Sequence, residues 1–476
     1  MGVLVFSTIS KDISTAPRDW RAEYFGLLND VLDKMEGESR MEKLWDITRA
    51  MGDNKSEILG QLTLAFVKRK YGELMEQEYC DCPKCKKKLK FRGKHKREVE
   101  THLGRFSLLR PYFYCVDCHL GFYPLDEALG LSASAKQYDV EDLSAWLASE
   151  LPYETAQETY RRCTGEKLSA HHMHEGVCEI ATDVEILDVC PTKEEVGRKI
   201  AELKEGRLRR PVAMLAIDGA HAPTRPEPSP RDTKRGKGEW KEIKGFRLYL
   251  IEAHEIVHLL SWHQIGTDED VATALKIIKD AGLIPEDSVR LCVVADGAAW
   301  IWNRCKEIFP AAKQVLDYYH CAEYLYDLAY AQYGKNTIKA QEWIEATLTR
   351  LFHNQKNHVL AGIKRMKATT PEARKQIEAT LQYLTKHKER LDYGAAKRGG
   401  FHIGSGAIES ANKFIGHVRL KRSGAWWYPS NANNILKLRC AKYNGTYDRI
   451  IERYRQRDQV KLYARDDRRH PGEVPR

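Results

Sequence analysis

Three acidic side chains stand where the sequence could build a site for divalent metal ions. Asp218 and Asp296 each close an apolar run, and Glu409 follows a Gly-Ser-Gly turn at residues 404–406. Such runs are typical of buried strands, so two carboxylates are expected at one edge of a sheet. Clustered carboxylates repel one another unless a cation neutralises them, and Mg²⁺ or Mn²⁺ prefers oxygen ligands of this kind. Two such ions would serve phosphodiester displacement, although any one of these acids alone could simply cap a loop.

Two CxxC pairs form a second candidate metal site, made of Cys82, Cys85, Cys115 and Cys118. Four thiolates in two chelating pairs supply the tetrahedral sulfur shell of a structural zinc. The 29 residues between the pairs predict a long intervening hairpin. Its lysines and arginines could contact phosphate. Alternatively, they could be the solvated face of a hairpin in which the zinc is purely structural. Cys80 or, less well, His119 could replace one ligand.

The segment His254-Glu255-Ile256-Val257-His258 matches the HExxH pattern of zinc proteases. On a helix the two histidines could share a zinc ion, with Glu255 as general base. The flanking aromatic and β-branched residues favour strands instead, in which the two histidines would stand about 13 Å apart. A metalloprotease with a second zinc is therefore the weakest of the functional hypotheses.

The composition predicts a soluble, globular protein with several structural units, since 476 residues exceed the usual length of one domain. Hydrophobic residues make up 42% and charged residues 30%, so the chain can bury cores and is not disordered throughout. A mean hydropathy of −0.55 and the lack of a long apolar run argue against a membrane span. No basic leader precedes the apolar start, and the 12 cysteines suit a reducing compartment, so a cytoplasmic location is expected. The net charge of +10 is compatible with a polyanionic partner without proving one.

Hydrophobic periodicity and chain punctuation divide the sequence into seven segments. Two of its helical stretches, Tyr153–Arg162 and Ser169–Ile180, outline a helix-turn-helix, for which an ordinary helical hairpin is the alternative. The segments are an N-terminal helical region (1–76), a zinc-ribbon-like four-cysteine module (77–128), a helical, helix-turn-helix-like DNA-binding region (129–210), the first part of a catalytic core (211–330), a helical insertion (331–395), the second part of the core with the Glu409 helix (396–444), and a basic C-terminal tail (445–476).

From Pro211 onward the sequence predicts an α/β domain. Strands are expected over 213–218, 246–253, 257–265, 291–296 and 314–317, with helices over 268–281 and 300–309. This β-β-β-α-β-α-β order is that of the ribonuclease H fold, and the long helical stretch that follows is interpreted as an insertion. The predicted fold class is an α/β ribonuclease H-like catalytic domain with an all-α insertion, preceded by helical and zinc-ribbon modules.

Four segments carry a resemblance to a known family: Asp218–Arg225, Val294–Ile301, Leu316–His320 and Gly404–Asn412. They resemble DDE transposases of bacterial insertion sequences, particularly the ISKra group, and the resemblance extends from the CxxC module to about Asn444. It implies a catalytic triad of Asp218, Asp296 and Glu409 that holds two Mg²⁺ (or Mn²⁺) ions. It also implies metal-dependent cleavage and strand transfer on double-stranded DNA, by a homodimer or larger assembly associated with the bacterial nucleoid.

Further residues are expected to support such a site. His320 matches a second-shell position of related transposases, with a buried, satisfied histidine as the alternative. Asn412 lies one turn beyond Glu409 and could hydrogen-bond that carboxylate or a phosphate. Trp426 and Trp427 offer stacking surfaces beside positive charge, unless they belong to the core. The predicted DNA-binding residues are Arg225, Lys234, Arg235, Lys237, Arg419, Lys421 and Arg422.

One rival function keeps the DNA-binding part and discards the chemistry. In that hypothesis the protein is a zinc-ribbon and helix-turn-helix DNA-binding regulator, derived from a transposase but catalytically silent. Equal DNA occupancy without metal-dependent nicking would distinguish it.

Overall fold

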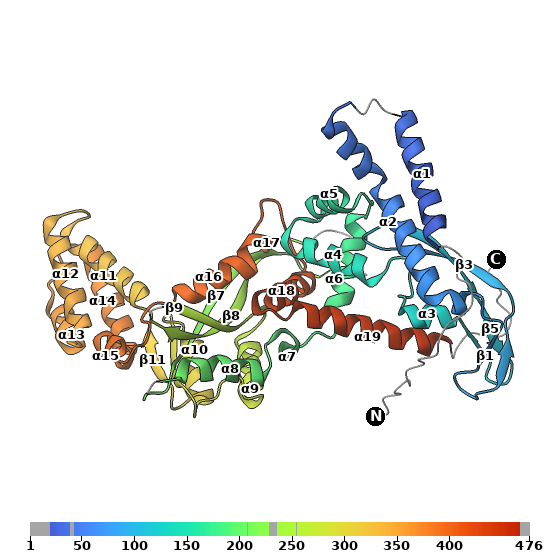
Figure 1. The fold of residues 1–476 in the computed structure, drawn as a ribbon. Coiled ribbons are helices and arrows are strands. Elements are labelled where there is room, and N and C mark those ends of the chain that lie inside the picture. Colours follow the sequence, from blue (N-terminus) through green and yellow to red (C-terminus); the bar gives the residue numbers. More distant parts are fainter. Residues whose placement is uncertain (1–19, 39–41, 207, 228–235, 254, 467–476) are drawn as a thin grey trace. The chain divides into compact units, whose positions relative to one another are not determined.

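The computed structural model describes residues 20–38, 42–206, 208–227, 236–253 and 255–466 (Figure 1). The chain forms two compact units. Of the described residues, one unit contains those up to 148, 153–176 and 453–466, and the other contains 149–152 and those between 177 and 452. Among the described helices, none combines the length and the apolar character that a membrane crossing requires. Lys234, Arg235 and His254 lie outside the described residues.

The described part of the first unit begins with two helices, α1 (Trp20–Glu38) and α2 (Leu44–Met75), which lie within the segment predicted to be an N-terminal helical region. A series of short strands follows: β1 (Tyr79–Asp81), β2 (Lys88–Lys90), β3 (Lys94–Glu100), β4 (Arg105–Pro111), β5 (Phe113–Cys115) and β6 (Leu120–Phe122). They pair as three antiparallel hairpins, β1 with β2, β3 with β4 and β5 with β6. The β3–β4 pair is the long hairpin that the spacing of the CxxC pairs predicts.

Four further helices lie wholly or partly in the first unit: α3 (Pro124–Leu129), α4 (Tyr138–Glu150), α5 (Tyr153–Thr164) and α6 (Ala170–Ala181). The α5 and α6 helices match the two helical stretches that outline the predicted helix-turn-helix. Glycine at C-cap position 130 adopts a left-handed backbone, with φ of 60°, and ends α3.

The second unit contains a mixed, five-stranded sheet in the order β11-β10-β7-β8-β9. Its strands are β7 (Val212–Thr224), β8 (Glu239–Glu252), β9 (Glu255–Ile265), β10 (Arg290–Ala295) and β11 (Lys313–Leu316). The first three are antiparallel neighbours, whereas β10 runs parallel to β7 and β11 runs parallel to β10. All five predicted strands are present, and residues 212–217 of β7 are buried, as the apolar run requires.

One strand prediction is wrong in its length. The strand expected to end at Asp218 continues to Thr224, because β8 remains paired with it through Gly219↔Lys244 and on to Thr224↔Glu239. Its pairing with β10 stops at Ile217↔Ala295. Asp218 therefore stands where β7 loses one neighbour while keeping the other.

Four helices precede or connect the strands: α7 (Ile186–Val189), α8 (Lys193–Lys204), α9 (Asp268–Asp280) and α10 (Ala299–Ile308). The start of α9 is a capping box, in which the Thr267 hydroxyl accepts from the Asp270 N–H and the Asp270 carboxylate accepts from the Thr267 N–H. This local chemistry explains why the predicted helix boundary agrees with the structure.

The segment after β11 is helical, as predicted, and forms a helical group of its own (Figure 1). It consists of α11 (Tyr318–Tyr333), α12 (Ile338–Phe352), α13 (Lys356–Arg365), α14 (Pro371–Lys386), the 3-10 turn η1 (Lys388–Arg390) and α15 (Tyr393–Arg398). Side-chain caps from Thr337 and Thr370 begin α12 and α14, and Pro371 occupies the first position of α14.

The chain then returns to the sheet. Helix α16 (Gly406–Ala411) continues directly into a π-helix, η2 (Asn412–His417), and this continues into α17 (Val418–Leu420). Two separate helices follow, α18 (Pro429–Asn444) and α19 (Tyr447–Asp466). Both α16 and η2 lie against β7, and α18 lies against β9. Buried Arg247 of β8 donates to the Ala407 carbonyl at 2.9 Å, so the sheet holds the first turn of α16 directly.

Candidate carboxylate and cysteine sites

The sheet brings three aspartates into one row. Because Ile217 pairs with Ala295 and Ala295 pairs with Leu316, the next residue of each parallel strand, Asp218, Asp296 and Asp317, comes at the same level. Glu409 reaches this region from α16, which packs against β7 and β8. The topology thus places the predicted acids Asp218, Asp296 and Glu409 around one sheet edge.

The electrostatics of Asp218 report the presence of the other two acids. Burial raises the pKa of Asp218 to about 6, and the negative charges of Asp296 and Glu409 add to this increase. A hydrogen bond from the Gly219 N–H and the nearby His320 act in the opposite direction. Asp218 is therefore a half-buried carboxylate in a field of like charge, and a cation beside it would stabilise its ionised form.

Asp317, the third acid of the row, has a different role. It is fully buried and caps α11, where its Oδ1 accepts from the His320 N–H at 2.9 Å. Its Oδ2 accepts from the Ser405 N–H, and the Ser405 hydroxyl donates to Glu409 Oε1 at 3.0 Å. These hydrogen bonds connect the end of β11 to the turn before Glu409, so Asp317 has a structural role in fixing the position of that turn.

The loop that carries Asp296 is fixed on both sides. Asp296 Oδ1 accepts from the Ala298 N–H at 2.9 Å, and its carbonyl accepts from the Trp302 indole at 2.8 Å. Tyr383 of α14 covers Gly297 so closely that a Cβ there would lie 2.3 Å from the ring. Tyr383 also stacks on Tyr324, with ring centroids 3.9 Å apart. The helical insertion is therefore packed against the Asp296 loop.

Asn412 contacts a different acid from the one that the helical spacing suggests. Its side-chain N–H donates to Asp218 Oδ2 at 2.8 Å, and its Oδ1 lies 2.9 Å from Nε2 of His263. The helical spacing predicts Glu409, one turn away, or a phosphate as its partner, but the π-helix that begins at Asn412 lies against the sheet. Asn412 therefore supports the carboxylate of β7.

His320 lies in the first turn of α11, and its side chain is 43% exposed, so it is not the buried, satisfied histidine of the alternative hypothesis. Its Nδ1 lies 3.2 Å from Glu323 Oε2. Because its charge affects Asp218, it lies within electrostatic reach of that carboxylate. That His320 supports the carboxylate site without binding the ions itself stays a prediction.

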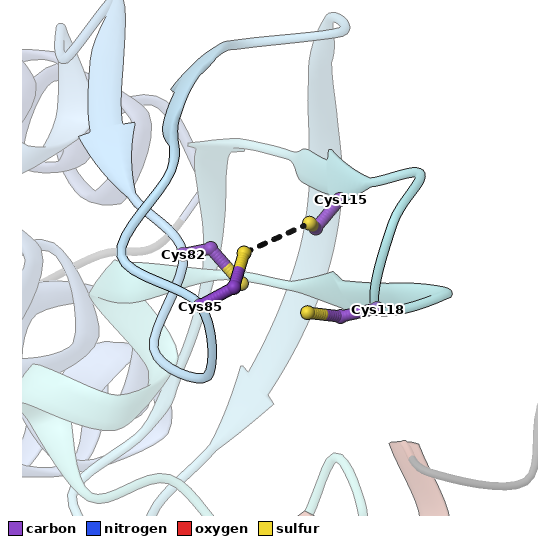
Figure 2. A group of neighbouring side chains, drawn as sticks. All are labelled: Cys82, Cys85, Cys115 and Cys118. Atoms are coloured by element: carbon purple, nitrogen blue, oxygen red, sulfur yellow. Dashed lines mark hydrogen bonds between the residues drawn. The ribbon is translucent and has the colours of Figure 1, made fainter.

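Figure 2 shows the four cysteines of the first unit with their sulfur atoms facing one another. The Sγ atoms of Cys82, Cys85, Cys115 and Cys118 all lie within 4.8 Å of one another. Among the described residues, no other set of three or more His, Cys, Asp or Glu side chains brings its ligand atoms this close. The cluster is compatible with a structural zinc, and it includes neither Cys80 nor His119.

Two equivalent turns build the cysteine cluster. The residue after each CxxC pair has a left-handed backbone, Lys86 with φ of 62° and His119 with φ of 52°. Burial disfavours the Cys82 thiolate, but N–H groups of Cys85 and Lys84 outweigh it and lower the pKa of Cys82 to about 7. Hydrogen bonding to Cys85 and burial raise the pKa of Cys118 to about 12. The sulfurs are thus held together by local backbone geometry, with one of them readily ionised.

The predicted basic residues divide into exposed and buried ones. Lys237, Lys421 and Arg422 are exposed, whereas Arg419 is only 3% exposed and its guanidinium lies 4.7 Å from the Trp427 ring. The buried position of Arg419 suits packing rather than a contact with DNA. Arg225 is half-buried, and its backbone N–H donates to the Trp427 carbonyl at 2.8 Å.

Trp427 is buried in the core, whereas two other tryptophans of the second unit, Trp240 and Trp426, are exposed. Trp240 is 56% exposed and Trp426 is 41% exposed. Lys421 lies 5.6 Å from the Trp240 ring, and Arg225 lies 5.8 Å from the Trp426 ring. We call Arg225, Trp240, Lys421 and Trp426 the tryptophan patch, because it joins exposed indoles with cations.

The first unit offers less positive charge than its composition suggests. The second helix of the helical hairpin, α6, has the sequence AHHMHEGVCEIA and carries no Lys or Arg. In the four-cysteine module, Lys87 pairs with Asp117 at 2.7 Å, and Arg97 pairs with Asp126 at 2.7 Å. These features favour the tryptophan patch over α6 as a surface for a polyanion.

The HExxH hypothesis does not agree with the structure over its described residues. Glu255–His258 lies in strand β9, not in a helix, and His254 is outside the described residues. His258 Nε2 lies 3.1 Å from Asn444 Oδ1. Because a strand points alternate residues to opposite faces, Glu255 and His258 cannot adopt the helical arrangement that this chemistry needs.

Sequence reasoning missed three residues that shape the carboxylate site: His263, Gly245 and Asp317. The sequence could have indicated Asp317, since this acid follows an apolar strand as Asp296 does. His263 and Gly245 carried none, because their importance depends on the register of three strands.

Comparisons with known proteins add a family and a weak structural similarity. A family model described as "Uncharacterised protein family (UPF0236)" matches residues 73–457. No curated protein matches the sequence significantly. Among solved structures, the Drosophila P element transposase strand transfer complex is similar with 12% identity and a TM-score of 0.26, over 71% of this chain and 87% of that chain. A TM-score this low does not establish a shared fold.

Proposed function

We propose that this chain, which belongs to the uncharacterised protein family UPF0236, is a DDE transposase that cleaves DNA and transfers strands with the help of divalent metal ions. The observation that carries the proposal is the convergence of Asp218, Asp296 and Glu409 at one edge of the five-stranded sheet. The strand order β11-β10-β7-β8-β9 supports a ribonuclease H-like core interrupted by the α11–α15 insertion.

The donor set fits hard cations. Three carboxylates offer only oxygen ligands, and the pKa of Asp218 is raised to about 6 by burial and by its acidic neighbours. Asp218, Asp296 and Glu409 would hold the ions. Bound Mg²⁺ or Mn²⁺ would supply charge neutralisation and an activated nucleophile for phosphodiester cleavage. The hydrogen bonds from Asp317 through Ser405 to Glu409 would hold the Glu409 carboxylate toward the site. After cleavage, the freed 3′-hydroxyl would attack target DNA.

We assign zinc to the cysteine cluster, in a zinc-ribbon-like module. The paired left-handed turns at Lys86 and His119 place all four sulfurs close enough for one tetrahedral ion. The same hairpins bury Leu89, Phe113 and Leu120 with Cys82 and Cys115, so the ion would complete a small core. This zinc would be structural, because all four ligands come from the protein.

We propose double-stranded DNA, as transposon ends and target, as the partner of the second unit. The tryptophan patch, with Lys237 and Arg422, joins positive charge to exposed rings, a combination that suits nucleic acid. A homodimer or larger assembly follows from the need to hold two ends together. The seven-segment division, with a DNA-binding role for residues 129–210, also remains a proposal.

The decisive experiment measures Mg²⁺- or Mn²⁺-dependent cleavage of DNA that carries the flanking genomic ends. Wild type should cleave, and Asp218→Asn, Asp296→Asn and Glu409→Gln should each lose activity by about 100-fold or more while still binding DNA. Glu255→Gln is the matched control, because this exposed acid of β9 belongs to the HExxH segment and should not matter. Tight end binding without any cleavage by wild type would favour the silent regulator instead.

A further inference from the structure

A row of three residues crosses β7, β8 and β9 beside the carboxylate site. Asp218 stands opposite Gly245, and Gly245 stands opposite His263. Neighbouring strands are about 4.8 Å apart, so the backbones of Asp218 and His263 are separated by roughly 10 Å. Directly opposed residues project from the same face of a sheet, and Gly245 leaves the middle position without a side chain. The carboxamide of Asn412 links the two outer side chains across this position.

The hydrogen bonds fix the orientation of the Asn412 amide. Its N–H donates to Asp218 Oδ2, so its Oδ1 must be the atom that faces His263 Nε2. That contact is a hydrogen bond only if Nε2 carries the proton and donates it. The other ring nitrogen, Nδ1, is buried and has no hydrogen-bond partner among the described residues. His263 is therefore the neutral tautomer with its proton on Nε2.

The neighbourhood keeps His263 neutral and in place. Burial is the main cause that lowers the pKa of His263 to about 4; the nearby Arg247 and His417 act in the same direction, and the hydrogen bond to Asn412 acts against them. A Cβ on Gly245 would lie 2.3 Å from the His263 ring, so only glycine leaves room for the imidazole. His263 is 2% exposed and Asn412 is 4% exposed, so bulk water does not reach either side chain.

We infer that His263 and Asn412 are positioning residues, which fix the direction in which the Asp218 carboxylate meets a divalent cation. The inference rests on the proposed function, since it assigns these residues to the same site. Neither residue touches the reacting atoms, and each acts through Asp218. Groups that orient a metal ligand in this way commonly contribute a factor of about 10 to 100 to metal affinity.

The second unit offers a matched control in the same strand. His258 also lies in β9, burial lowers its pKa to about 4 as well, and it contacts the side chain of Asn444. It is not part of the Asp218 row. If His263 were only a core histidine, His263→Leu and His258→Leu would have similar effects. His263→Gln is the conservative variant, because its amide N–H can replace the donor at Nε2.

The test measures Mn²⁺ affinity of the full-length protein by electron paramagnetic resonance, with cleavage kinetics in parallel. His263→Leu and Asn412→Ala should weaken Mn²⁺ binding about tenfold or more, whereas His263→Gln should recover most of it. In cleavage, kcat should fall while KM for DNA stays the same, and His258→Leu should match wild type in both measurements. Folded His263→Leu protein with wild-type Mn²⁺ affinity, or an equal loss in His258→Leu, would overturn the inference.

A separate readout distinguishes failure of the inference from failure of the proposed function. If wild type binds no Mn²⁺, the proposed function is wrong. NMR of protein labelled with ¹⁵N-asparagine then tests separately whether His263 holds the Asn412 side chain in its hydrogen bonds. The Asn412 amide signal, identified by its absence in Asn412→Ala, should exchange slowly with solvent in wild type and in His263→Gln. Exchange at the same rate in wild type and in His263→Leu would show that His263 does not hold Asn412.

Discussion

The cysteine cluster and the carboxylate group are both candidate metal sites, but they differ in how fully each is formed. Local turns bring the four sulfurs within 4.8 Å of one another. The acids come from two strands and a helix far apart in the sequence, and their ligand oxygens are not gathered that closely. Protonated thiols are neutral and can pack into a small core, whereas ionised carboxylates repel one another. Under the proposed assignments, the cysteine site would need its ion for folding, because two of its ligands belong to the core of a small module, whereas the carboxylate site would need its ions for catalysis.

Loss of the first site should have the largest effect. Cys82→Ser should remove the single bound zinc and unfold the β1–β6 module, since structural zinc contributes roughly 10 kcal/mol or more to small metal domains. Zinc content by mass spectrometry of metals and circular dichroism would measure both. Cys80→Ser is the matched control, because this half-buried cysteine lies next to the cluster but outside it. Full zinc content in Cys82→Ser would refute the ligand assignment.

Within the acidic row, the buried member should stabilise the fold and the half-buried member should not. Asp317→Ala would leave the His320 and Ser405 N–H groups without their acceptor and should cost about 2 to 4 kcal/mol. Asp218→Asn should instead raise the melting temperature, because the pKa of Asp218 is raised to about 6 and its charge therefore opposes folding at neutral pH. Scanning calorimetry would measure both. A loss of stability in Asp218→Asn would contradict the assignment.

Acid should destabilise the second unit through its buried histidines. Burial lowers the pKa of His258 to about 4, so between pH 6.5 and 4 the unfolded chain takes up a proton there that the folded chain does not. The free energy of unfolding therefore falls as the pH drops through this window, by about 2 kcal/mol at pH 5. Urea unfolding at pH 7.5 and 5.0 should show a smaller loss for His258→Gln than for wild type. An equal loss in both would contradict the lowered pKa.

The smallest effect is expected at the tryptophan patch. Trp240→Ala and Trp426→Ala should each weaken binding to duplex DNA with a single-stranded end by about 1 kcal/mol, which is roughly fivefold, because a surface that can stack on unpaired bases is lost. Fluorescence anisotropy with such labelled DNA would measure the change at fixed salt. Trp45→Ala changes a tryptophan of α2 that is even more exposed, at 73%, and should bind like wild type. Equal losses in all three variants would argue against a specific surface.

Those features of the molecule that depend on local sequence were predictable. Apolar runs located all five strands, and the acids Asp218 and Asp296 were recognisable beside them. The CxxC spacing indicated which cysteines gather, since two residues between ligands allow one turn to carry both. The capping residues of α9 similarly fixed its start.

Features that depend on long-range register were not predictable. The β7 strand continues past Asp218 only because β8 pairs with it there, and no local pattern reveals that pairing. Helical spacing predicts the Glu409 carboxylate or a phosphate as the partner of Asn412, but the π-helix lies against the sheet, where Asn412 meets Asp218. Arg419 seemed a surface cation and is buried against Trp427, since a charge in the sequence does not reveal its exposure.

The most direct test of the account is anomalous diffraction from crystals of the wild-type protein soaked in Mn²⁺. The account predicts manganese bound by Asp218, Asp296 and Glu409, and zinc bound by the four cysteines. Manganese absent from those carboxylates, with the zinc in place and the three acids accessible to solvent, would contradict a metal-dependent nuclease.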